Sequence, residues 1–239
     1  MKKEKYNQIY LLGDIHGNFN FVSGLIKHIE EDSLIIQLGD FGVGFRPSSE
    51  KHSLNQLNDL LDQKKITLYA IRGNHENPDC FNNPAKFGFN LSRIQLLPDY
   101  TYKEINDKKF AFVGGAVSID RYIGSSGVDW WDGEGVKLND KYEKSDILIS
   151  HTAPSFCDPI DSDANLWNAI FRFCFHATSD QKQDMFNDLR DERKKLDEIV
   201  KGINPSNLYY GHFHFSAYRY IESAKLHARL LDINEWVKL

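Results

Sequence analysis

Residues 9–17 read IYLLGDIHG, an apolar run that ends in a polar motif flanked by glycines. Four consecutive apolar residues followed by glycine are typical of a short buried strand in a parallel sheet. Asp14 and His16 are two residues apart, so in extended chain their side chains point the same way and can bind one cation together. The stretch therefore predicts a strand with metal ligands at its carboxyl end.

Four further motifs repeat this arrangement along the chain. Each follows its own apolar run and supplies Asp, Asn or His side chains: Gly39-Asp40, Gly73-Asn74-His75-Glu76, Ser150-His151 and Gly211-His212-Phe213-His214. A single Asp-x-His or His-x-His pair would be weak evidence, because such pairs are common without a metal. Together, at separate strand ends, the motifs predict an edge of a sheet that holds a pair of divalent metals.

Helical patterns separate the first three motifs. Apolar residues recur at helical spacing over 21–29 and again over 54–61, before a predicted strand at 66–71. This β-α-β-α-β order predicts parallel strands whose loops gather at the carboxyl ends, where ligands of open sheets usually bind. The first three motifs should converge there.

The second half of the chain is richer in short strands. We expect them at 109–115, 146–150, 208–211, 217–221 and 229–233, and these predict a second, more antiparallel sheet stacked on the first. Residues 178–201 are rich in charge but carry apolar residues on one face, which predicts a solvated amphipathic helix. Trp167 and the alternating Phe171, Phe173 and Phe175 predict a small apolar cluster.

Length and composition suit one large α/β domain. The chain has 239 residues and 41% hydrophobic content, so we expect a single domain over 1–239, with a cap or insert at about 155–201. The formal net charge of -5 gives no basic footprint for tight binding to a nucleic acid or a membrane surface. The three cysteines form no CxxC pattern and predict reduced thiols in a cytoplasmic protein. We expect no export signal and no membrane span.

The motifs at 13–214, in this order, resemble those of the calcineurin-like metallophosphoesterase superfamily. The resemblance implies an α/β fold of two stacked mixed β-sheets flanked by helices, a four-layer sandwich. It also implies two metal ions drawn from Mn, Fe, Zn, Ni or Co, with Mn expected in vitro. The implied ligands of the first ion are Asp14, His16, Asp40 and His214, and those of the second are Asp40, Asn74, His151 and His212. The Asp40 carboxylate would bridge both ions.

The resemblance also implies a catalytic role for His75, which would protonate the leaving oxygen or stabilise the transition state. Charge supports phosphate chemistry independently. Two divalent cations with Asp14 and Asp40 as the anionic ligands leave a site of about +2, which favours phosphoryl oxygens. We therefore predict a metal-dependent hydrolase of phosphate esters, in which a hydroxide that bridges the metals attacks phosphorus in line.

The second motif departs from the pattern of serine/threonine protein phosphatases. Those relatives continue it as Gly-Asp-x-Val-Asp-Arg-Gly, with an Asp that orients the catalytic His and an Arg that grips phosphate. Here Val43 and Gly44 stand at those places. Arg46 is a candidate substitute for the phosphate contact, with an exposed loop arginine that makes no such contact as the alternative. Trp130 and Trp131, in a loop rich in Gly, Ser and Asp, are candidates for stacking on a flat part of the substrate, with packing beneath the loop as the alternative.

We expect Arg72 and Glu76 to form a structural ion pair around the third motif rather than to act chemically.

Several functions remain open. The alternatives to a general phosphoesterase are a nucleotide or nucleic-acid phosphodiesterase or phosphatase, or an enzyme like the serine/threonine protein phosphatases. A non-enzymatic interaction module on the same fold would be marked by lost ligands, but every ligand position and His75 is retained. The expected partner is a phosphorylated substrate, with a nucleic acid left open and a membrane not expected.

Overall fold

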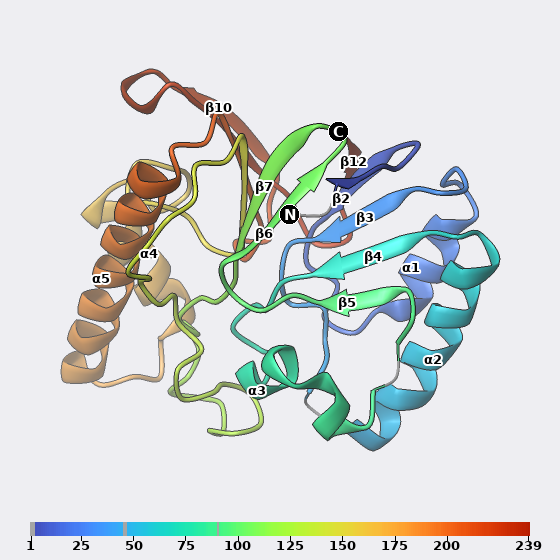
Figure 1. Ribbon diagram of the computed structural model, residues 1–239. Coiled ribbons are helices and arrows are strands. Elements are labelled where there is room, and N and C mark those ends of the chain that lie inside the picture. The colour runs from blue at the N-terminus through green and yellow to red at the C-terminus, as the bar shows by residue number, and fades with distance from the viewer. Residues whose placement is uncertain (1–2, 45–46, 90) are drawn as a thin grey trace.

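Two stacked β-sheets form the centre of the computed structural model, which describes residues 3–44, 47–89 and 91–239 (Figure 1). Within these residues the five-stranded sheet contains, in spatial order, β12 (Trp236–Lys238), β2 (Ile9–Leu12), β3 (Leu34–Gln37), β4 (Thr67–Ala70) and β5 (Ile94–Leu96). The seven-stranded sheet contains β1 (Lys3–Glu4), β6 (Thr101–Ile105), β7 (Lys108–Val113), β8 (Ile147–Ser150), β9 (Asn207–Tyr210), β11 (Leu226–Leu230) and β10 (Ala217–Ile221).

Helices cover the outer faces of both sheets. They are α1 (Phe19–Ile26), α2 (Pro47–Gln63), α3 (Pro78–Asn82), α4 (Asp163–Phe173) and α5 (Ser179–Ile203), with short 3-10 turns η1 (Pro84–Phe87) and η2 (Glu222–Ala224). In Figure 1, α1 and α2 lie outside the five-stranded sheet, and α4 and α5 lie outside the seven-stranded sheet. The layer order helix, sheet, sheet, helix confirms the predicted fold class of two mixed sheets flanked by helices.

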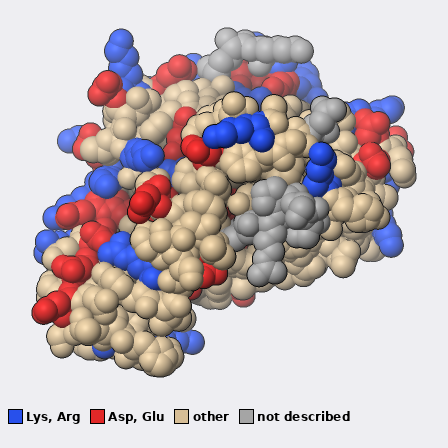
Figure 2. Space-filling view, turned by 90° about the horizontal axis from the view of Figure 1, so that it is seen from below, with Lys and Arg blue, Asp and Glu red and all other residues tan. Residues whose placement is uncertain are grey.

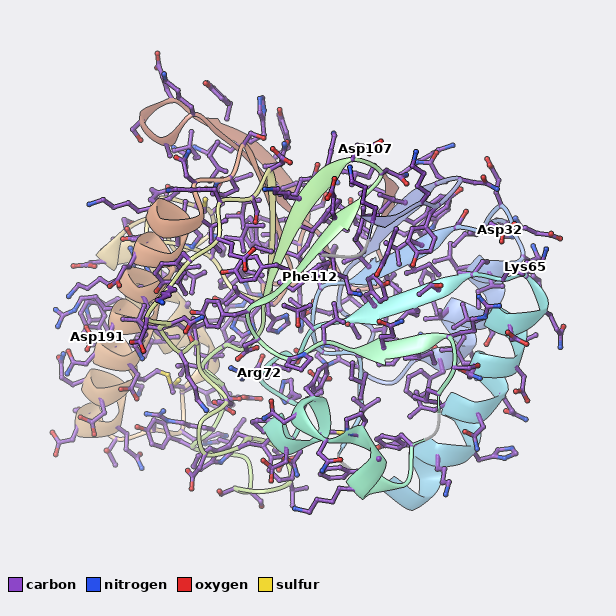
Figure 3. The ribbon with its side chains drawn as sticks, viewed as in Figure 1. Asp32, Lys65, Arg72, Asp107, Phe112 and Asp191 are labelled. Atoms are coloured by element: carbon purple, nitrogen blue, oxygen red, sulfur yellow. The ribbon has the colours of Figure 1, made fainter. Side chains whose placement is uncertain are left out.

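The core follows from strands that are buried on both faces. Leu11, Leu34 and Ile36 project between the sheets, where they pack against Phe110 and Phe112 of the seven-stranded sheet. Figure 3 shows Phe112 in this central position. The alternate residues of β2 and β3 project outward to the face covered by α1 and α2. Burial on both faces explains why these strands are continuous apolar runs rather than alternating ones.

The strands β2, β3, β4 and β5 run parallel, so their carboxyl ends lie at one edge of the sheet. Asp32 and Lys65, which precede β3 and β4, lie at the right-hand edge of the molecule in Figure 3, whereas Arg72, which follows β4, lies near its centre. The parallel order predicted for the first three motifs is confirmed. Their loops therefore share one edge, at which a site can form.

Among the described residues the second sheet is only slightly more antiparallel than the first, with two antiparallel pairs of six against one of four, and parallel pairing predominates in both. The strands β7, β8, β9 and β11 run parallel, and antiparallel pairing joins β6 to β7 and β10 to β11. Parallel neighbours cannot be joined by a tight turn and need a longer crossover. An irregular segment at 114–146 joins β7 to β8, and α4 and α5 join β8 to β9. The strand expected at 229–233 lies earlier, at Leu226–Leu230.

The amphipathic helix predicted at 178–201 is confirmed as α5. A capping box between Thr178 and Gln181 begins it, and Asn204 ends it in the left-handed conformation. Its apolar face packs on the seven-stranded sheet. In the view from below, acidic and basic side chains are interspersed over the left part of the surface, the side on which α5 lies (Figure 2). The charge run is therefore a solvated face.

The aromatic cluster expected around Trp167 does not form as predicted. Phe171 stacks on Trp167, but it is 62% exposed, and Phe173 and Phe175 are also exposed. Phe171 and Phe173 lie two apart on α4 and therefore point to different sides, and Phe175 follows the end of that helix. The segment at 155–201 contains both α4 and α5, and its assignment as a cap or insert stays a prediction.

Two further expectations concern the state of the cysteines and the presence of a membrane-spanning helix. Cys80, Cys157 and Cys174 are buried free thiols. Among the described residues, no helix combines the length and the apolar character needed to cross a membrane.

Candidate metal centre and active-site cleft

The loops after five strands bring the predicted ligands together. Those after β2, β3 and β4 come from the five-stranded sheet, and those after β8 and β9 come from the seven-stranded sheet. They supply Asp14, His16, Asp40, Asn74, His151, His212 and His214. The ligand atoms of Asp14, His16, Asp40 and His214 lie within 4.8 Å of one another, and so do those of Asp40, His151 and His212. Asp40 belongs to both groups, as the predicted bridging ligand would.

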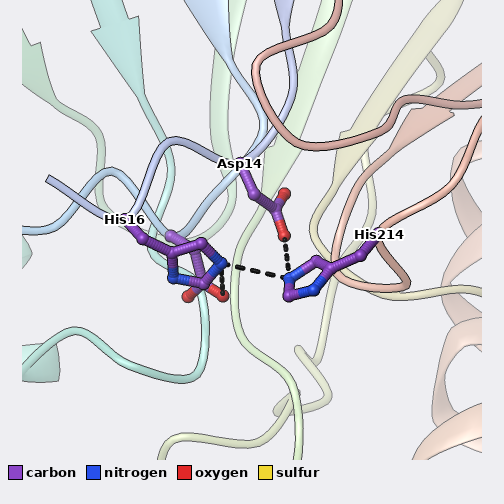
Figure 4. Close-up of side chains that lie close together, drawn as sticks. Asp14, His16 and His214 are labelled. Atoms are coloured by element: carbon purple, nitrogen blue, oxygen red, sulfur yellow. Dashed lines mark hydrogen bonds and ion pairs between the residues drawn. The ribbon is translucent and has the colours of Figure 1, made fainter. Parts of the chain in front are cut away.

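The first group has the geometry of a cation site (Figure 4). The Nε2 atoms of His16 and His214 are 3.1 Å apart, and His214 Nε2 is 3.4 Å from a carboxylate oxygen of Asp14. His16 Nε2 is 3.9 Å from Oδ2 of Asp40. Imidazole nitrogens and carboxylate oxygens that converge in this way are suitable ligands for a borderline divalent metal.

The second group is more deeply buried. His151 Nε2 lies 3.4 Å from Oδ2 of Asp40 and 3.2 Å from Oδ1 of Asn74. The other ring nitrogen of His151, Nδ1, donates a hydrogen bond to the carbonyl of Leu38 at 2.8 Å, since a carbonyl can only accept. With a metal ion bound, this bond would leave the lone pair of Nε2 for the ion, as a metal-ligating histidine requires.

Burial makes the electrostatics of the site strong. Asp14 and Asp40 are each 1% exposed. Burial alone would raise the pKa of Asp40, but the adjacent His151, together with His75 and His16, holds it well below its usual range. Burial likewise opposes a charge on His151, yet Asp40 and Asp14 raise its pKa to about 10. The negative potential that raises this pKa equally favours a bound cation, so the residues fit divalent metal ions.

The backbone at the ligands is unusual. His16, Asp40, His212 and His214 have φ between 44° and 73°, in the left-handed region that side chains other than glycine seldom adopt. Such conformations cluster at functional sites, where the surrounding structure holds them. Gly211 shows how closely the chain approaches the ligands, because a Cβ there would overlap a carboxylate oxygen of Asp14.

Glu76 holds the backbone of the loops by hydrogen bonds and does not pair with Arg72. It is fully buried and accepts hydrogen bonds from the backbone N–H groups of Asp40 at 3.1 Å and Gly42 at 2.7 Å. Arg72 instead pairs with Asp99 at 2.8 Å. The predicted Arg72–Glu76 ion pair is therefore wrong. Buried backbone N–H groups need acceptors, and the Glu76 carboxylate satisfies those of the second motif.

A cleft of about 490 Å³ opens beside the ligands, and Asp40, Asn74 and His75 line it. The facing wall is α4, which contributes Asn165, Asn168 and Arg172. Their spacing of three and four residues places them on one face of the helix. Sequence reasoning did not select these three residues, although this spacing was a readable signal.

His75 lines the cleft beside the ligands. Its ring centroid is 5.5 Å from that of His16, and its Nδ1 lies 2.9 Å from the carbonyl oxygen of Asp129. Burial lowers the pKa of His75, but the negative charge of Asp40 and the bond to Asp129 outweigh it and raise the pKa above its ordinary value. The ring therefore lies beside the ligands in the wall of the cleft.

The three candidate substrate contacts lie elsewhere or outside the described residues. Trp130 and Trp131 line a separate cavity of about 350 Å³ together with Glu134 and Asp191, the latter seen on α5 in Figure 3. The Trp131 indole donates a hydrogen bond to the backbone carbonyl of His75 at 3.2 Å. Arg46 lies outside the residues that the structure describes. A substrate role for these residues stays a prediction.

Comparison with known proteins is consistent with this geometry. The model of the family described as calcineurin-like phosphoesterase matches residues 8–232. A search of curated protein sequences finds no match. One similar crystal structure has 11% identity and a TM-score of 0.56, and the match covers 97% of this chain and 94% of that one. The crystal structure of the protein TT1561 from Thermus thermophilus has 10% identity and a TM-score of 0.50, with 95% and 90% covered. At these identities the likeness shows the fold alone.

Proposed function

The chain belongs to the calcineurin-like phosphoesterase family, a family of metal-dependent hydrolases, and on this premise we propose that it hydrolyses phosphate esters with two divalent ions. The observation that carries the proposal is the position of Asp40, whose carboxylate lies within both ligand groups. Two ions bound there would supply positive charge for the phosphoryl oxygens and would lower the pKa of a bound water.

We assign the ligands by group. The first ion would be held by Asp14, His16, Asp40 and His214, and the second by Asp40, Asn74, His151 and His212. Mixed imidazole and carboxylate ligands suit Mn, Fe, Zn, Ni or Co, whereas Ca²⁺ prefers sites made of oxygen ligands alone. Manganese is the ion we propose for activity in vitro.

His75 is the proposed general acid. Its Nδ1 must carry the proton in the bond to the Asp129 carbonyl, because that oxygen can only accept. Proton transfer to the oxygen that leaves phosphorus would then come from Nε2. The position of His75 in the wall of the cleft supports this assignment.

The shape and lining of the cleft support a small organic phosphate as substrate. A volume of about 490 Å³ is in the range of small-molecule sites. Arg172 offers a cation to a second anionic or polar group, and Phe173, Phe213 and Phe215 offer apolar surface beside the ligands. Of the alternative functions, a phosphoesterase acting on a nucleotide or another aromatic phosphate ester is the one this lining favours.

A comparison of two chromogenic substrates tests the proposal. Mn-loaded protein should hydrolyse p-nitrophenyl phosphate or bis-p-nitrophenyl phosphate, and the faster of the two identifies a monoesterase or a diesterase. Panels of nucleotides, dinucleotides and phosphopeptides then narrow the substrate class. Protein that binds two Mn²⁺ ions per chain yet hydrolyses no member of any panel would contradict the proposed function.

A further inference from the structure

The irregular segment at 118–134 connects the two halves of the site. It belongs to the crossover between β7 and β8 of the seven-stranded sheet, yet it contacts Asn74 and His75, which follow β4 of the five-stranded sheet. Loops usually lie on the surface and gain order from a few side-chain contacts. We name this segment the positioning loop.

Glu134 ties the two ends of the positioning loop together. It is 5% exposed, and its carboxylate accepts hydrogen bonds from the backbone N–H of Ser118 at 2.6 Å and from the Ser118 hydroxyl at 2.9 Å. The same carboxylate accepts a bond from the backbone N–H of Trp131 at 3.0 Å. A buried carboxylate with three donors fixes the position of each of them.

Ser118 in turn fixes the orientation of Asn74. Its hydroxyl is fully buried, and because its own proton is directed to Glu134, its oxygen accepts a hydrogen bond from Nδ2 of Asn74 at 3.0 Å. With Nδ2 held there, the Asn74 carbonyl oxygen Oδ1 faces His151. Only Oδ1 can bind a cation, since the amide NH₂ is a donor. The hydroxyl therefore selects the amide orientation that a metal ligand needs.

The middle of the positioning loop holds His75. The Asp129 carbonyl accepts the Nδ1 proton at 2.9 Å, and the Trp131 indole donates to the His75 carbonyl at 3.2 Å. One bond orients the ring and the other fixes its backbone.

We infer that the positioning loop sets the geometry of the site from outside it, with Ser118 and Glu134 orienting the Asn74 ligand and Asp129 and Trp131 orienting His75. The inference rests on the proposed function, because Asn74 is taken as a metal ligand and His75 as the general acid. Ser118, Glu134 and Trp131 are positioning residues, since each acts through another side chain or through the backbone.

Binding of Mn²⁺ measured by titration calorimetry, without substrate, tests the first half. Ser118→Ala should weaken the second site about 10-fold or more, as is usual when a residue that orients a metal ligand is lost. Ser118→Thr keeps the hydroxyl and should restore affinity, and Ser126→Ala, an exposed serine of the same loop, should change nothing. Wild-type protein that binds no Mn²⁺ would refute the proposed function. Two ions bound equally tightly by wild type and Ser118→Ala would refute the positioning of Asn74 alone.

The dependence of rate on leaving group tests the second half. Trp131→Phe should lower kcat about 5-fold on phenyl phosphate, whose leaving oxygen needs a proton. This magnitude is expected because the loss of one hydrogen bond changes a rate by about a factor of 10 or less. The loss on p-nitrophenyl phosphate, a better leaving group, should be smaller, and KM and Mn²⁺ affinity should stay unchanged. Trp236→Phe, at an exposed tryptophan of β12, is the matched control. Equal losses on both substrates, or equal effects of the two variants, would overturn the inference.

Discussion

At the residue scale, Asp40 and His75 are neighbours with separate tasks. Asp40 belongs to both ligand groups, whereas His75 belongs to neither and lines the cleft. The backbone N–H of His75 donates to Oδ1 of Asp40 at 3.2 Å, so the two residues are coupled structurally. Their contributions can still be separated, because loss of a ligand changes metal binding and loss of a proton donor changes turnover.

His75→Ala should lower kcat by about 100-fold or more, since general acid catalysis contributes on that order. Metal content, measured by elemental analysis of the same preparation, should stay near that of the wild type. The cavity left by the ring borders the cleft and should cost little stability. A variant that loses its metal together with its activity would show that His75 is part of the metal site.

Asp40→Asn should weaken both metal sites at once, because it replaces an anionic oxygen shared by two ligand groups with a neutral amide. Mn²⁺ titration of the variant should show lower affinity for each ion. Asp14→Asn is the comparison, since Asp14 belongs to one group and its loss should weaken mainly the first site. Identical responses of the two variants would remove the case for a bridging role of Asp40.

Sequence patterns predicted the ligands but not the residues that hold them. Asp14, Asp40 and His151 each follow an apolar strand, and strand ends are recognisable from local sequence. Ser118 contacts Asn74 across 44 positions, and the partner of His75 is a backbone carbonyl, Asp129. A backbone carbonyl leaves no signature in the sequence, and a distant serine resembles any other.

At the scale of elements, α4 forms the wall of the cleft that faces the ligands. Its buried face carries Leu166 and Ile170, and its polar face turns Asn168 and Arg172 toward the cleft. The helix contributes none of the predicted ligands. Its sequence can therefore determine which organic group is accepted without changing the reaction at phosphorus.

Arg172→Ala should raise KM for substrates that carry a second anionic group by about 10-fold, the value of one charge-assisted hydrogen bond. Turnover of p-nitrophenyl phosphate, which lacks such a group, should change little. Lys194→Ala on α5 is the control, because that side chain is exposed and does not line the cleft among the described residues. Equal losses on both kinds of substrate would place substrate choice elsewhere.

The helix α5 carries a buried acid that makes stability depend on pH. Glu192 is 3% exposed and accepts hydrogen bonds from the backbone N–H groups of Val117 and Val136, both at 3.2 Å. Burial raises its pKa to about 7 in spite of these bonds. The folded state therefore holds this proton more tightly than the unfolded state does, between the ordinary pKa of 4.5 and about 7.

The free energy of unfolding should consequently fall as the pH rises through this window, by up to about 3 kcal/mol from this one group. Glu192→Gln cannot titrate, so its unfolding free energy should lack that decrease. Urea unfolding of wild type and variant at pH 5 and pH 8 measures the difference between the two slopes. Parallel pH dependence in both proteins would show that Glu192 does not titrate in this range.

The elements that the sequence specified best are those with regular periodicity. The helices α1 and α2 follow apolar spacing that can be read directly, and so does α5. The parallel order of β7 and β8 was missed because the segment that connects them, 114–146, is irregular and carries no helical signal. Strand direction depends on what the connection does in space, and an irregular crossover leaves it undetermined.

At the scale of the whole molecule, the candidate metal centre joins the two sheets. Asp14, His16, Asp40 and Asn74 follow strands of the five-stranded sheet. His151, His212 and His214 follow strands of the seven-stranded sheet. Each ligand group takes members from both. Bound ions would therefore link the halves of the sandwich at one edge.

Removal of metal should for this reason destabilise the entire fold. Ions at about 100 times their dissociation constant stabilise the folded state by roughly 2.7 kcal/mol per site, so two sites give about 5 kcal/mol. In a domain of this size each kcal/mol shifts Tm by about 2–4 °C, which predicts a decrease of roughly 10–20 °C on chelation. Thermal unfolding with EDTA and with added Mn²⁺ measures the shift, and elemental analysis should approach two ions per chain. Asp40→Asn should respond much less. If chelation removed both ions and left Tm unchanged, the ions would not link the two sheets.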